Sequence, residues 1–362
     1  MKIGIYTIFQ SNNFGAQLQA YATQTYLRNL GHETELVYYS PQTKDLKYLY
    51  SYSWFNWKGI LLNIWSLVIP SIWIKKKRIS KFQERLIKSR KYVSLEELSS
   101  NPPSYDIHLV GSDQVWNTEK GINYFFFLSF LPVGTIKLSY GPSFGNITST
   151  IPYKNEICRL LSSFEEISVR ENDAVDFLNE ECRINAVEVI DPTFLLSTNE
   201  WDELAGRYPI IKNKYILYYG FTNDNYTKEA IRMVRDILRM PVVGVSVSIL
   251  TPYRFDRFYQ SAGPNEFLNL VKYSSFVLTS SYHGLAFAMN YKRNFVVLPL
   301  KARMNRMRSL LDKIGLATRI VNDIDTLKMT VKEQIDYTKI EPLLNSAIQL
   351  SKEWLTSSLN NR

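Results

Sequence analysis

Polar side chains follow a largely apolar run of the sequence, at the point where a buried strand would end. The run is Ile107–Val110, and the residues after it read Gly-Ser-Asp-Gln-Val-Trp-Asn. A carboxylate, two amides and an indole ring at one strand end can bind sugar hydroxyls through paired hydrogen bonds and ring stacking. A structural turn is the alternative. The candidate ligand-binding side chains are Asp113, Gln114, Trp116 and Asn117.

A histidine follows a second apolar run in the same way. Phe276–Leu278 precede a polar turn that contains His283, and a helix is predicted from Ser281 to Asn290. The first amides of a helix have no partner within it and attract anions. A phosphate near Ser281 and Gly284 could therefore rest on this helix while the imidazole gives or takes a proton. His108, inside a strand, is predicted to be a core residue.

Arginine side chains follow two further runs. Arg170 comes directly after Glu166–Val169, and its planar guanidinium suits a carboxylate or a phosphate. An ion pair with Glu171 or with a neighbouring carboxylate is the structural alternative. Four cations follow Asn294–Leu298 and form either an anion clamp or a solvated basic face. They are Lys301, Arg303, Arg306 and Arg308, of which Arg303 and Arg306 share one helix face.

The first apolar run is followed by a polar turn, Ser11–Ala16, that opens a predicted helix. Its free amides and Asn13 could receive an anion or a sugar hydroxyl, and a plain N-cap by Asn12 or Asn13 explains the turn equally well. The sequence lacks a dinucleotide fingerprint, a Walker loop, a nucleophile elbow and the spacing of a His/Cys metal site. Asp323-Ile324-Asp325 is interpreted as a loop or helix cap, so no metal is expected.

These residues need elements that bring them together, and the sequence predicts strands that alternate with helices. Predicted strands lie at Lys2–Ile8, Thr34–Tyr38, Tyr105–Val110, Thr135–Tyr140, Ile167–Arg170, Ala186–Ile190, Lys214–Tyr219, Val242–Val247, Ser275–Leu278 and Asn294–Leu298. Predicted helices lie at Gly15–Leu30, Lys154–Ser163, Asn172–Glu180, Asn225–Leu238, Pro264–Tyr273, Ser281–Asn290, Met304–Ile314 and Glu333–Leu355. This alternation predicts an α/β fold with parallel sheets.

The length of 362 residues predicts two domains. The polar stretch Ser197–Asn213 is the expected linker, so we place an N-terminal α/β domain at 1–200 and a C-terminal α/β domain with a final helix at 201–362. Ligands of such sheets bind at the carboxyl ends of the strands, so a cleft between the two domains is expected.

The charge of the chain is concentrated in one segment. The net charge is +9, and nine basic residues with one acidic residue between Lys75 and Lys91 contribute +8 of it. This distribution disfavours a nucleic-acid binder, which spreads its cations over a groove. Four tryptophans, at positions 54, 57, 65 and 73, precede the basic residues. The segment 51–91 is either a contact with an anionic membrane or with a lipid-linked substrate, or it is a buried helix followed by a solvated one.

The compartment is predicted from the cysteines and the N-terminus. Cys158 and Cys182 lie in no metal or redox motif and are expected to be free thiols in a reducing cytosol. The N-terminal apolar run is too short for a secretory signal and is expected to be a strand. Gly59–Ile74 is too short to span a bilayer. We expect a cytoplasmic protein, either free or peripheral on the inner face of the cytoplasmic membrane.

Several of these motifs together resemble the polysaccharide pyruvyl transferase family. The resemblance covers most of the chain in order. It is carried by Asn13–Ala16 with Leu18–Tyr21, Gly111–Asn117, Tyr140–Gly145, Ser168–Glu171, Asp191–Leu196, Ser281–Gly284 and Asn305-Arg306.

The resemblance implies two Rossmann-like domains in a GT-B-like architecture, with the acceptor on the N-terminal side and the donor on the C-terminal side. It implies transfer of pyruvate from phosphoenolpyruvate, as a cyclic ketal, to two hydroxyls of a sugar in an exopolysaccharide, a capsule or a polyprenyl-diphosphate-linked precursor. Phosphoenolpyruvate is then a co-substrate, and no cofactor is expected. His283 and Asp113 would move protons. Arg170, Ser281, Gly284, Arg303 and Arg306 would bind the donor, and Asn13, Gln114, Trp116 and Asn117 the acceptor.

Two other functions stay open at this stage. One is a sugar-nucleotide glycosyltransferase of the same architecture, and the other is a non-catalytic partner that binds a glycan or a membrane.

Overall fold

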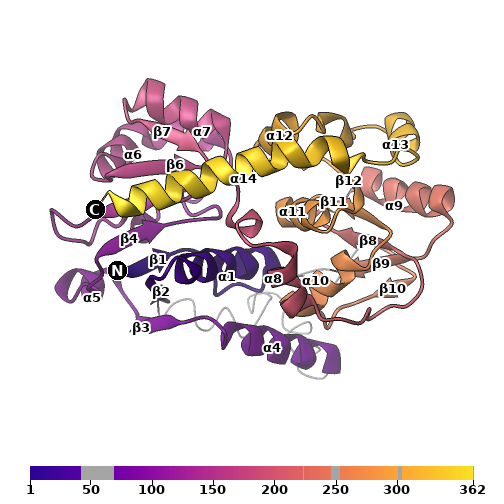
Figure 1. Cartoon of the computed structure of the whole chain (residues 1–362), viewed down its shortest axis with the longest axis horizontal. Helices are drawn as coiled ribbons and strands as arrows, with labels where there is room; N and C mark the ends of the chain where they lie inside the picture. The colour runs from indigo at the N-terminus through magenta and orange to yellow at the C-terminus, as the bar shows by residue number, and fades with distance from the viewer. Residues whose placement is uncertain (42–68, 223, 246–252, 301–303, 362) are drawn as a thin grey trace, which may run out of the picture.

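Two parallel sheets form the framework of the molecule (Figure 1). The computed structural model describes residues 1–41, 69–222, 224–245, 253–300 and 304–361. The first sheet has seven strands in the order β3-β2-β1-β4-β5-β6-β7, and the second has five in the order β10-β9-β8-β11-β12. All their pairings are parallel. The predicted α/β class with two Rossmann-like domains is confirmed.

The strands of the first sheet are β1 (Lys2–Tyr6), β2 (Glu33–Tyr39), β3 (Lys88–Tyr92), β4 (Ile107–Val110), β5 (Lys137–Ser139), β6 (Glu166–Val169) and β7 (Ala186–Glu188). Those of the second are β8 (Ile216–Tyr219), β9 (Val242–Val245), β10 (Arg257–Phe258), β11 (Phe276–Thr279) and β12 (Asn294–Val297). The edge strands β3 and β10 were not expected. The sequence of β3, Lys-Ser-Arg-Lys-Tyr, has no apolar run, because charged side chains protect a sheet edge rather than fill a core.

The helices between the strands are α1 (Phe14–Asn29), α4 (Pro70–Gln83), α5 (Leu95–Ser100), α6 (Lys154–Leu161), α7 (Asn172–Asp176), α8 (Thr198–Ala205) and α9 (Asn225–Leu238), followed by α10 (Pro264–Lys272), α11 (Tyr282–Asn290), α12 (Met304–Lys313), α13 (Ile324–Thr330) and α14 (Tyr337–Asn360). Helix α9 has the predicted bounds. Its N-cap Asp224 accepts a hydrogen bond from the Thr227 amide at 2.7 Å, and Ala230, Ile231 and Val234 form its buried face. Asp323 caps α13, so its predicted capping role is confirmed.

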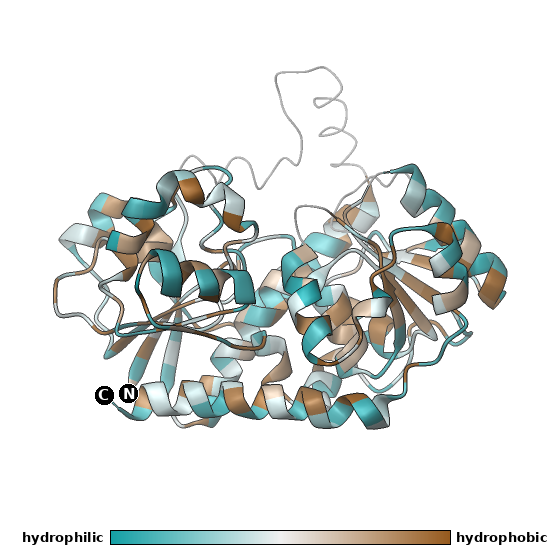
Figure 2. Cartoon of the chain, turned by 90° about the horizontal axis from the view of Figure 1, so that it is seen from above, coloured by the Kyte–Doolittle hydropathy of each residue, from teal (hydrophilic) through white to brown (hydrophobic). Residues whose placement is uncertain are grey.

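The last helix belongs to both halves of the molecule. It starts beside the second sheet and runs back along the first, so that the C-terminus lies next to the N-terminus (Figures 1 and 2). Leu355 and Leu359 are buried in one cluster with Ile3 and Ile5 of β1. The Ser351 hydroxyl accepts a hydrogen bond from the backbone of residue 190 at 2.9 Å. Helix α14 therefore stabilises the relative placement of the two sheets.

Helix α4 forms a second bridge and uses part of the basic segment structurally. The Lys75 ammonium is buried over the ring of Phe14, 5.2 Å from its centroid, and burial lowers the pKa of Lys75 to about 8. Arg78 forms an ion pair with Glu266 of α10 at 3.0 Å. Trp73 is 55% exposed, whereas the tryptophans at 54, 57 and 65 lie outside the described residues. None of the described helices is long and apolar enough to cross a membrane.

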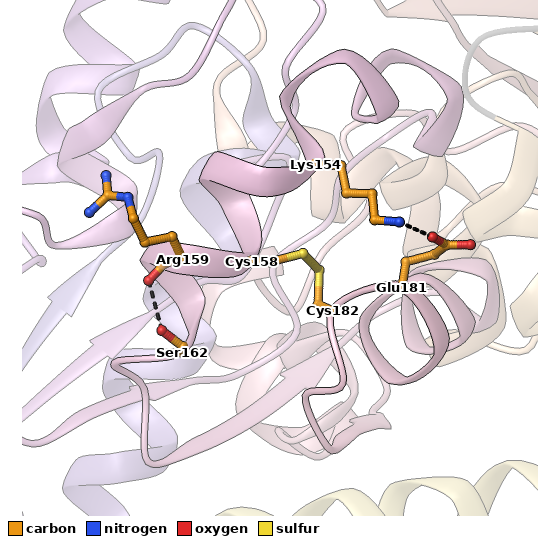
Figure 3. Close-up of a disulfide and its surroundings, with 6 residues drawn as sticks. All are labelled: Lys154, Cys158, Arg159, Ser162, Glu181 and Cys182. Carbon is orange, nitrogen blue, oxygen red and sulfur yellow. Dashed lines mark hydrogen bonds and ion pairs between the residues drawn. A yellow bond between two sulfur atoms is a disulfide. The ribbon is translucent and has the colours of Figure 1, made fainter.

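The two cysteines form a disulfide, so the prediction of free thiols was wrong (Figure 3). Cys158 lies on α6, and Cys182 follows the π-helical turn Phe177–Glu181 that continues α7. Their Cα atoms are 5.0 Å apart although 24 positions separate them in the sequence. An ion pair between Lys154 and Glu181 joins the same two segments. The sequence places both residues near helix ends, but only the packing of α6 against α7 brings the sulfur atoms together.

Candidate active site

Five charged or titratable side chains meet between the carboxyl ends of the two sheets. One Arg170 nitrogen, Nη1, donates a hydrogen bond to Asp191 Oδ2, and the other, Nη2, lies 3.5 Å from Asp113 Oδ1. Arg306 Nη1 lies 3.9 Å from the same Asp113 oxygen. His283 Nε2 lies 3.7 Å from Asp191 Oδ2. We call Asp113, Arg170, Asp191, His283 and Arg306 the central cluster.

The order of strands in the first sheet explains how three of these residues meet. Asp113 follows β4, Arg170 follows β6 and Asp191 follows β7, and β4, β5, β6 and β7 are consecutive neighbours. Asp113 has a positive φ of 68°, which turns the chain back so that its carbonyl accepts a hydrogen bond from the Ser143 amide at 2.8 Å. Asp191 is held by the amide and the hydroxyl of Thr193, at 2.9 and 2.7 Å. The carboxylates are thus oriented by backbone geometry before any ligand binds.

His283 comes from the second sheet but touches the first domain. It lies in the first turn of α11, and the N-terminus of α1 packs against its ring. A Cβ atom on Gly15 would stand only 2.1 Å from His283 Nδ1, so glycine is required for this close approach. Asn13 caps α1 by accepting a hydrogen bond from the Gly15 amide at 2.9 Å. Its predicted alternative role as an N-cap is therefore observed, next to the central cluster.

An aromatic ring lies against both arginines. The ring centroid of Tyr282 is 4.7 Å from the Arg170 guanidinium carbon and 5.6 Å from that of Arg306. Burial raises the pKa of the Tyr282 hydroxyl, so it stays protonated. The ring stabilises two like charges side by side without adding a negative charge that would compete with a ligand.

The two arginines differ in how well their charges are compensated. Burial disfavours the Arg170 cation, but the surrounding acidic groups, of which Asp191 contributes most, together outweigh burial and raise the pKa of Arg170. Burial together with the charge of Arg170 lowers the pKa of Arg306 to about 10. Burial also raises the pKa of Asp191, but Arg170 and His283 outweigh it, so the pKa of Asp191 is lowered and the group is a carboxylate at neutral pH. Burial lowers the pKa of His283, which Asp191 opposes. Arg306 is thus the cation that an added anion would stabilise most.

Several buried donor atoms of the cluster lack a hydrogen-bond partner among the described residues. They are Nε and Nη2 of Arg170, Nε of Arg306 and Nε2 of His283. An unsatisfied buried polar group costs about 1–3 kcal/mol, and more when it is charged. Native proteins keep such groups rarely, and a ligand with several acceptor oxygens would satisfy them. Within the described part of the chain, no three His, Cys, Asp or Glu side chains are grouped as metal ligands would be.

Comparison with known protein families decides the assignment. A family model described as polysaccharide pyruvyl transferase matches residues 13–301, which include every element of the central cluster except the helix α12 that carries Arg306. The chain belongs to the polysaccharide pyruvyl transferase family. It is therefore a transferase, as predicted. No curated protein matches the chain.

The fold of this pyruvyl transferase family member also occurs in nucleotide-sugar enzymes. A UDP-N-acetylglucosamine 2-epimerase from Neisseria meningitidis, solved with UDP-N-acetylglucosamine, superimposes with a TM-score of 0.53 at 10% identity, covering 100% of both chains. The same enzyme from Rickettsia bellii gives a TM-score of 0.51 at 11% identity, covering 99% of this chain and 96% of that one. At such identities the likeness shows the fold alone, and it confirms the GT-B-like architecture.

The structure does not bring every predicted site residue of the pyruvyl transferase into the cluster. Trp116 is fully buried against Phe127 and Phe144, and its indole N–H donates a hydrogen bond to the Phe126 carbonyl at 3.0 Å. The prediction that Trp116 stacks on a sugar is corrected, because neither ring face is accessible. The indole instead supports the loop that carries Asp113.

The remaining predicted residues lie around the cluster in supporting positions. Gln114 and Asn117 are half-buried, and their amide nitrogens approach Gly145 so closely that a Cβ there would stand 2.6 Å from both. Ser281 is buried at the N-cap of α11, and its amide donates to Thr279 Oγ1 at 3.0 Å. Gly284 permits the close packing of α11 on Thr279. Arg303 lies outside the described residues.

Three residues around the pyruvyl transferase cluster were not predicted to act there. Asp191 follows the predicted strand Ala186–Ile190, so the strand-end pattern that identified Arg170 could also have identified it. Tyr282 is adjacent to His283, but an isolated tyrosine carries no chemical signal in sequence. Glu171 is buried, and its Oε1 accepts hydrogen bonds from the Ser143 hydroxyl at 2.7 Å and the Phe144 amide at 2.8 Å. The sequence indicates Glu171 only as a possible ion-pair partner of Arg170.

Proposed function

We propose that this transferase moves a pyruvyl group from phosphoenolpyruvate to two hydroxyls of one sugar and forms a cyclic ketal. The acceptor would belong to an exopolysaccharide, a capsule or a polyprenyl-diphosphate-linked precursor at the inner face of the cytoplasmic membrane. The observation that carries the proposal is a pair of buried arginines with N–H groups that make no hydrogen bond to any described residue, beside a histidine whose Nε2 makes none either.

Phosphoenolpyruvate fits this set of donors chemically. It has a carboxylate and a phosphate, so it needs two cationic or amide-rich positions close to each other. Arg170 and Arg306 lie on either side of the same Asp113 oxygen, and the first amides of α11 lie next to His283. A guanidinium binds either anion through two parallel hydrogen bonds, and a helix N-terminus favours phosphate. The reaction then needs no further cofactor.

The chemistry consists of balanced proton transfers. A proton adds to the methylene carbon of phosphoenolpyruvate, and one sugar hydroxyl attacks C2 as it loses its own proton. The phosphate then leaves with the proton that the first hydroxyl released, which creates a cationic centre at C2. The second hydroxyl closes the ring and releases a proton, which replaces the one added to the methylene carbon. The products are the ketal and inorganic phosphate. Arginine and helix N–H groups stabilise the charge of the departing phosphate.

His283 is suited to supply the first proton once the donor is bound. Burial lowers its pKa in the free site, and Asp191 opposes this effect. A bound dianion would offset the charges of Arg170 and Arg306 and raise the affinity of the imidazole for a proton. The histidine would thus become an acid only when phosphoenolpyruvate is present, which limits unproductive proton transfer.

Asp113 is suited to take a proton from the acceptor. Its side chain is 12% exposed, whereas those of Arg170 and Asp191 are at most 1% exposed. It is therefore the carboxylate of the cluster that an incoming hydroxyl would reach first. Its neighbours Gln114 and Asn117 would contact the same sugar.

Phosphate release from phosphoenolpyruvate, measured with lipid-linked saccharides as acceptors, tests the proposal. Mass spectrometry of the acceptor should show a gain of one pyruvate less one water. UDP-sugars serve as the alternative donors in a parallel reaction. Consumption of a UDP-sugar, with no phosphate released from phosphoenolpyruvate, would replace the proposal with a sugar-nucleotide glycosyltransferase.

A further inference from the structure

A polar pocket separate from the central cluster lies at one end of the first sheet. It has a volume of about 280 Å³ and lies between the carboxyl ends of β1 and β2 and helix α4. Its polar lining includes Gln10, Asn12, Ser40, Lys76, Ser80, Gln83 and Lys88. We call this cavity the β1–β2 pocket. The central cluster does not use any of these residues.

The chemistry of the β1–β2 pocket suits an anionic saccharide. Among the described residues, its charged lining consists of Lys76 and Lys88 and includes no acidic side chain. Amides and hydroxyls from the surrounding loops add neutral donors and acceptors, as sugar hydroxyls require. The ring of Tyr38 also lines the pocket and packs edge-on against Phe9, so one wall is aromatic.

The structure divides the basic segment into cations with partners and cations without them. Arg78 pairs with Glu266 and Arg90 pairs with Glu97, while Lys75 is buried over Phe14. Among the described residues, Lys76 and Lys88 form no ion pair, although the Lys76 ammonium lies 5.5 Å from the ring centroid of Trp73. The positive charges of Lys76 and Lys88 can therefore bind a ligand.

The chain itself connects the β1–β2 pocket to the central cluster. Asn12 lines the pocket, Asn13 caps α1, and Gly15 touches the ring of His283. Three residues of extended chain span about 10 Å at most. A saccharide with its reacting hydroxyls in the central cluster would therefore have its neighbouring group within reach of the pocket.

We infer that the β1–β2 pocket binds an anionic group of the acceptor, either a phosphate or a sugar carboxylate, next to the sugar that receives pyruvate. The inference rests on the proposed function, because it treats the ligand as the acceptor. It assigns Lys76 and Lys88 to acceptor selection and separates them from the arginines that would bind the donor.

Calorimetric titration of the full chain tests the inference with two probes, inorganic pyrophosphate and glucuronic acid, and with glucose as the neutral control. The donor site is first filled with phosphoenolpyruvate, whose own binding is titrated separately. If phosphoenolpyruvate does not bind, the proposed function fails. The probes are then titrated into the Arg306→Gln variant, because Arg306 is the cation of the central cluster that would otherwise bind an added anion. The two failures are therefore distinguishable.

The decisive comparison is between two double variants that remove the same charge. Lys76→Gln/Lys88→Gln changes the pocket, whereas Lys77→Gln/Lys81→Gln changes exposed lysines of α4 that do not line it. We expect at least one probe to bind the wild type, about tenfold weaker binding in the pocket variant, and binding within about twofold of wild type in the control.

The two probes separate the possible sources of the anion. Pyrophosphate binding alone would indicate a phosphorylated carrier, and glucuronate binding alone an acidic sugar. The inference is overturned if neither probe binds, if both double variants behave alike, or if the affinity of the wild type for the probe falls as the phosphoenolpyruvate concentration is raised.

Discussion

Nε2 of His283 lies 3.7 Å from Oδ2 of Asp191, and the same carboxylate oxygen accepts a hydrogen bond from Arg170. The histidine belongs to the second domain and the aspartate to the first. One buried carboxylate therefore connects the candidate proton carrier with a candidate donor-binding arginine across the domain boundary. Loss of the Asp191 carboxylate should therefore affect both the charge compensation of Arg170 and proton transfer by His283.

Replacing Asp191 with asparagine should destabilise the protein and impair the reaction. The substitution leaves Arg170 buried without its strongest partner, which costs about 3–5 kcal/mol for a buried pair. Urea unfolding measures this loss. Asp202→Asn, which removes the carboxylate that pairs with the partly exposed Lys272, is the control and should cost about 1 kcal/mol at most. Equal stability of wild type and Asp191→Asn would contradict the role of Asp191.

Replacing His283 with alanine should lower the rate of phosphate release while the fold is kept. General acid catalysis contributes about 10²–10⁴-fold, so kcat should fall by about that factor. Activity assays combined with circular dichroism measure both properties. His32→Ala, at a histidine away from the cluster, should keep wild-type activity. A His283→Ala enzyme with near wild-type turnover would exclude the imidazole as a proton carrier.

Replacing Gly15 with alanine should impair catalysis without touching any charged group. The added Cβ would stand 2.1 Å from Nδ1 and 2.3 Å from Cγ of His283, so the ring or the start of α1 must shift. Overpacking costs about 1–3 kcal/mol of stability, and the displaced imidazole should lower kcat more than this loss implies. Thermal unfolding and kcat are measured in parallel.

Gly31→Asn is the control for the glycine substitution. Gly31 has a φ of 89° and open space around it, and asparagine tolerates this conformation. If Gly15→Ala and Gly31→Asn have the same kcat, the contact between Gly15 and His283 has no functional role.

Replacing Arg306 with glutamine should weaken donor binding and cost little stability. Its charge is poorly compensated in the free protein, as the lowered pKa of about 10 indicates. A hydrogen bond to a charged group contributes about 1.5–3 kcal/mol, so the affinity for phosphoenolpyruvate should fall about 10–100-fold. Calorimetry measures the affinity and urea unfolding the stability. Arg308→Gln, on the same helix, is the control, and unchanged affinity in Arg306→Gln would remove Arg306 from the donor site.

Acidification should destabilise the protein through buried His108. Burial lowers the pKa of His108 from 6.5 to about 4, so the unfolded chain binds more protons than the folded chain between these values. Stability therefore rises with pH in this window and is lost as pH falls below 6.5. Between pH 7 and pH 5 the contribution of His108 should fall by about 2 kcal/mol. Urea unfolding of wild type and His108→Gln at both pH values measures this contribution, because the variant has no imidazole that can be protonated. Equal pH dependence of the two proteins would contradict the prediction.

Local patterns in the sequence predicted the architecture and much of the cluster. The periodicity of a strand or a helix can be recognised in consecutive residues. In helix α9, for example, an N-cap residue and an apolar face together define the helix. The observation that ligands bind at strand ends then identified Asp113, Arg170 and His283. These predictions succeed because they depend on one element at a time.

Tertiary structure decided which of these residues meet. The adjacency of β6 and β7 places Asp191 against Arg170, and the packing of α1 on α11 places Gly15 against His283. Other contacts within the first domain buried Trp116 and joined Cys158 to Cys182, both contrary to expectation. Burial and pairing arise from residues far apart in the chain, so no local pattern encodes them. The sequence by itself therefore determined the types of chemical groups at the strand ends, and only the arrangement of the two sheets decided their partners, their charges and their accessibility.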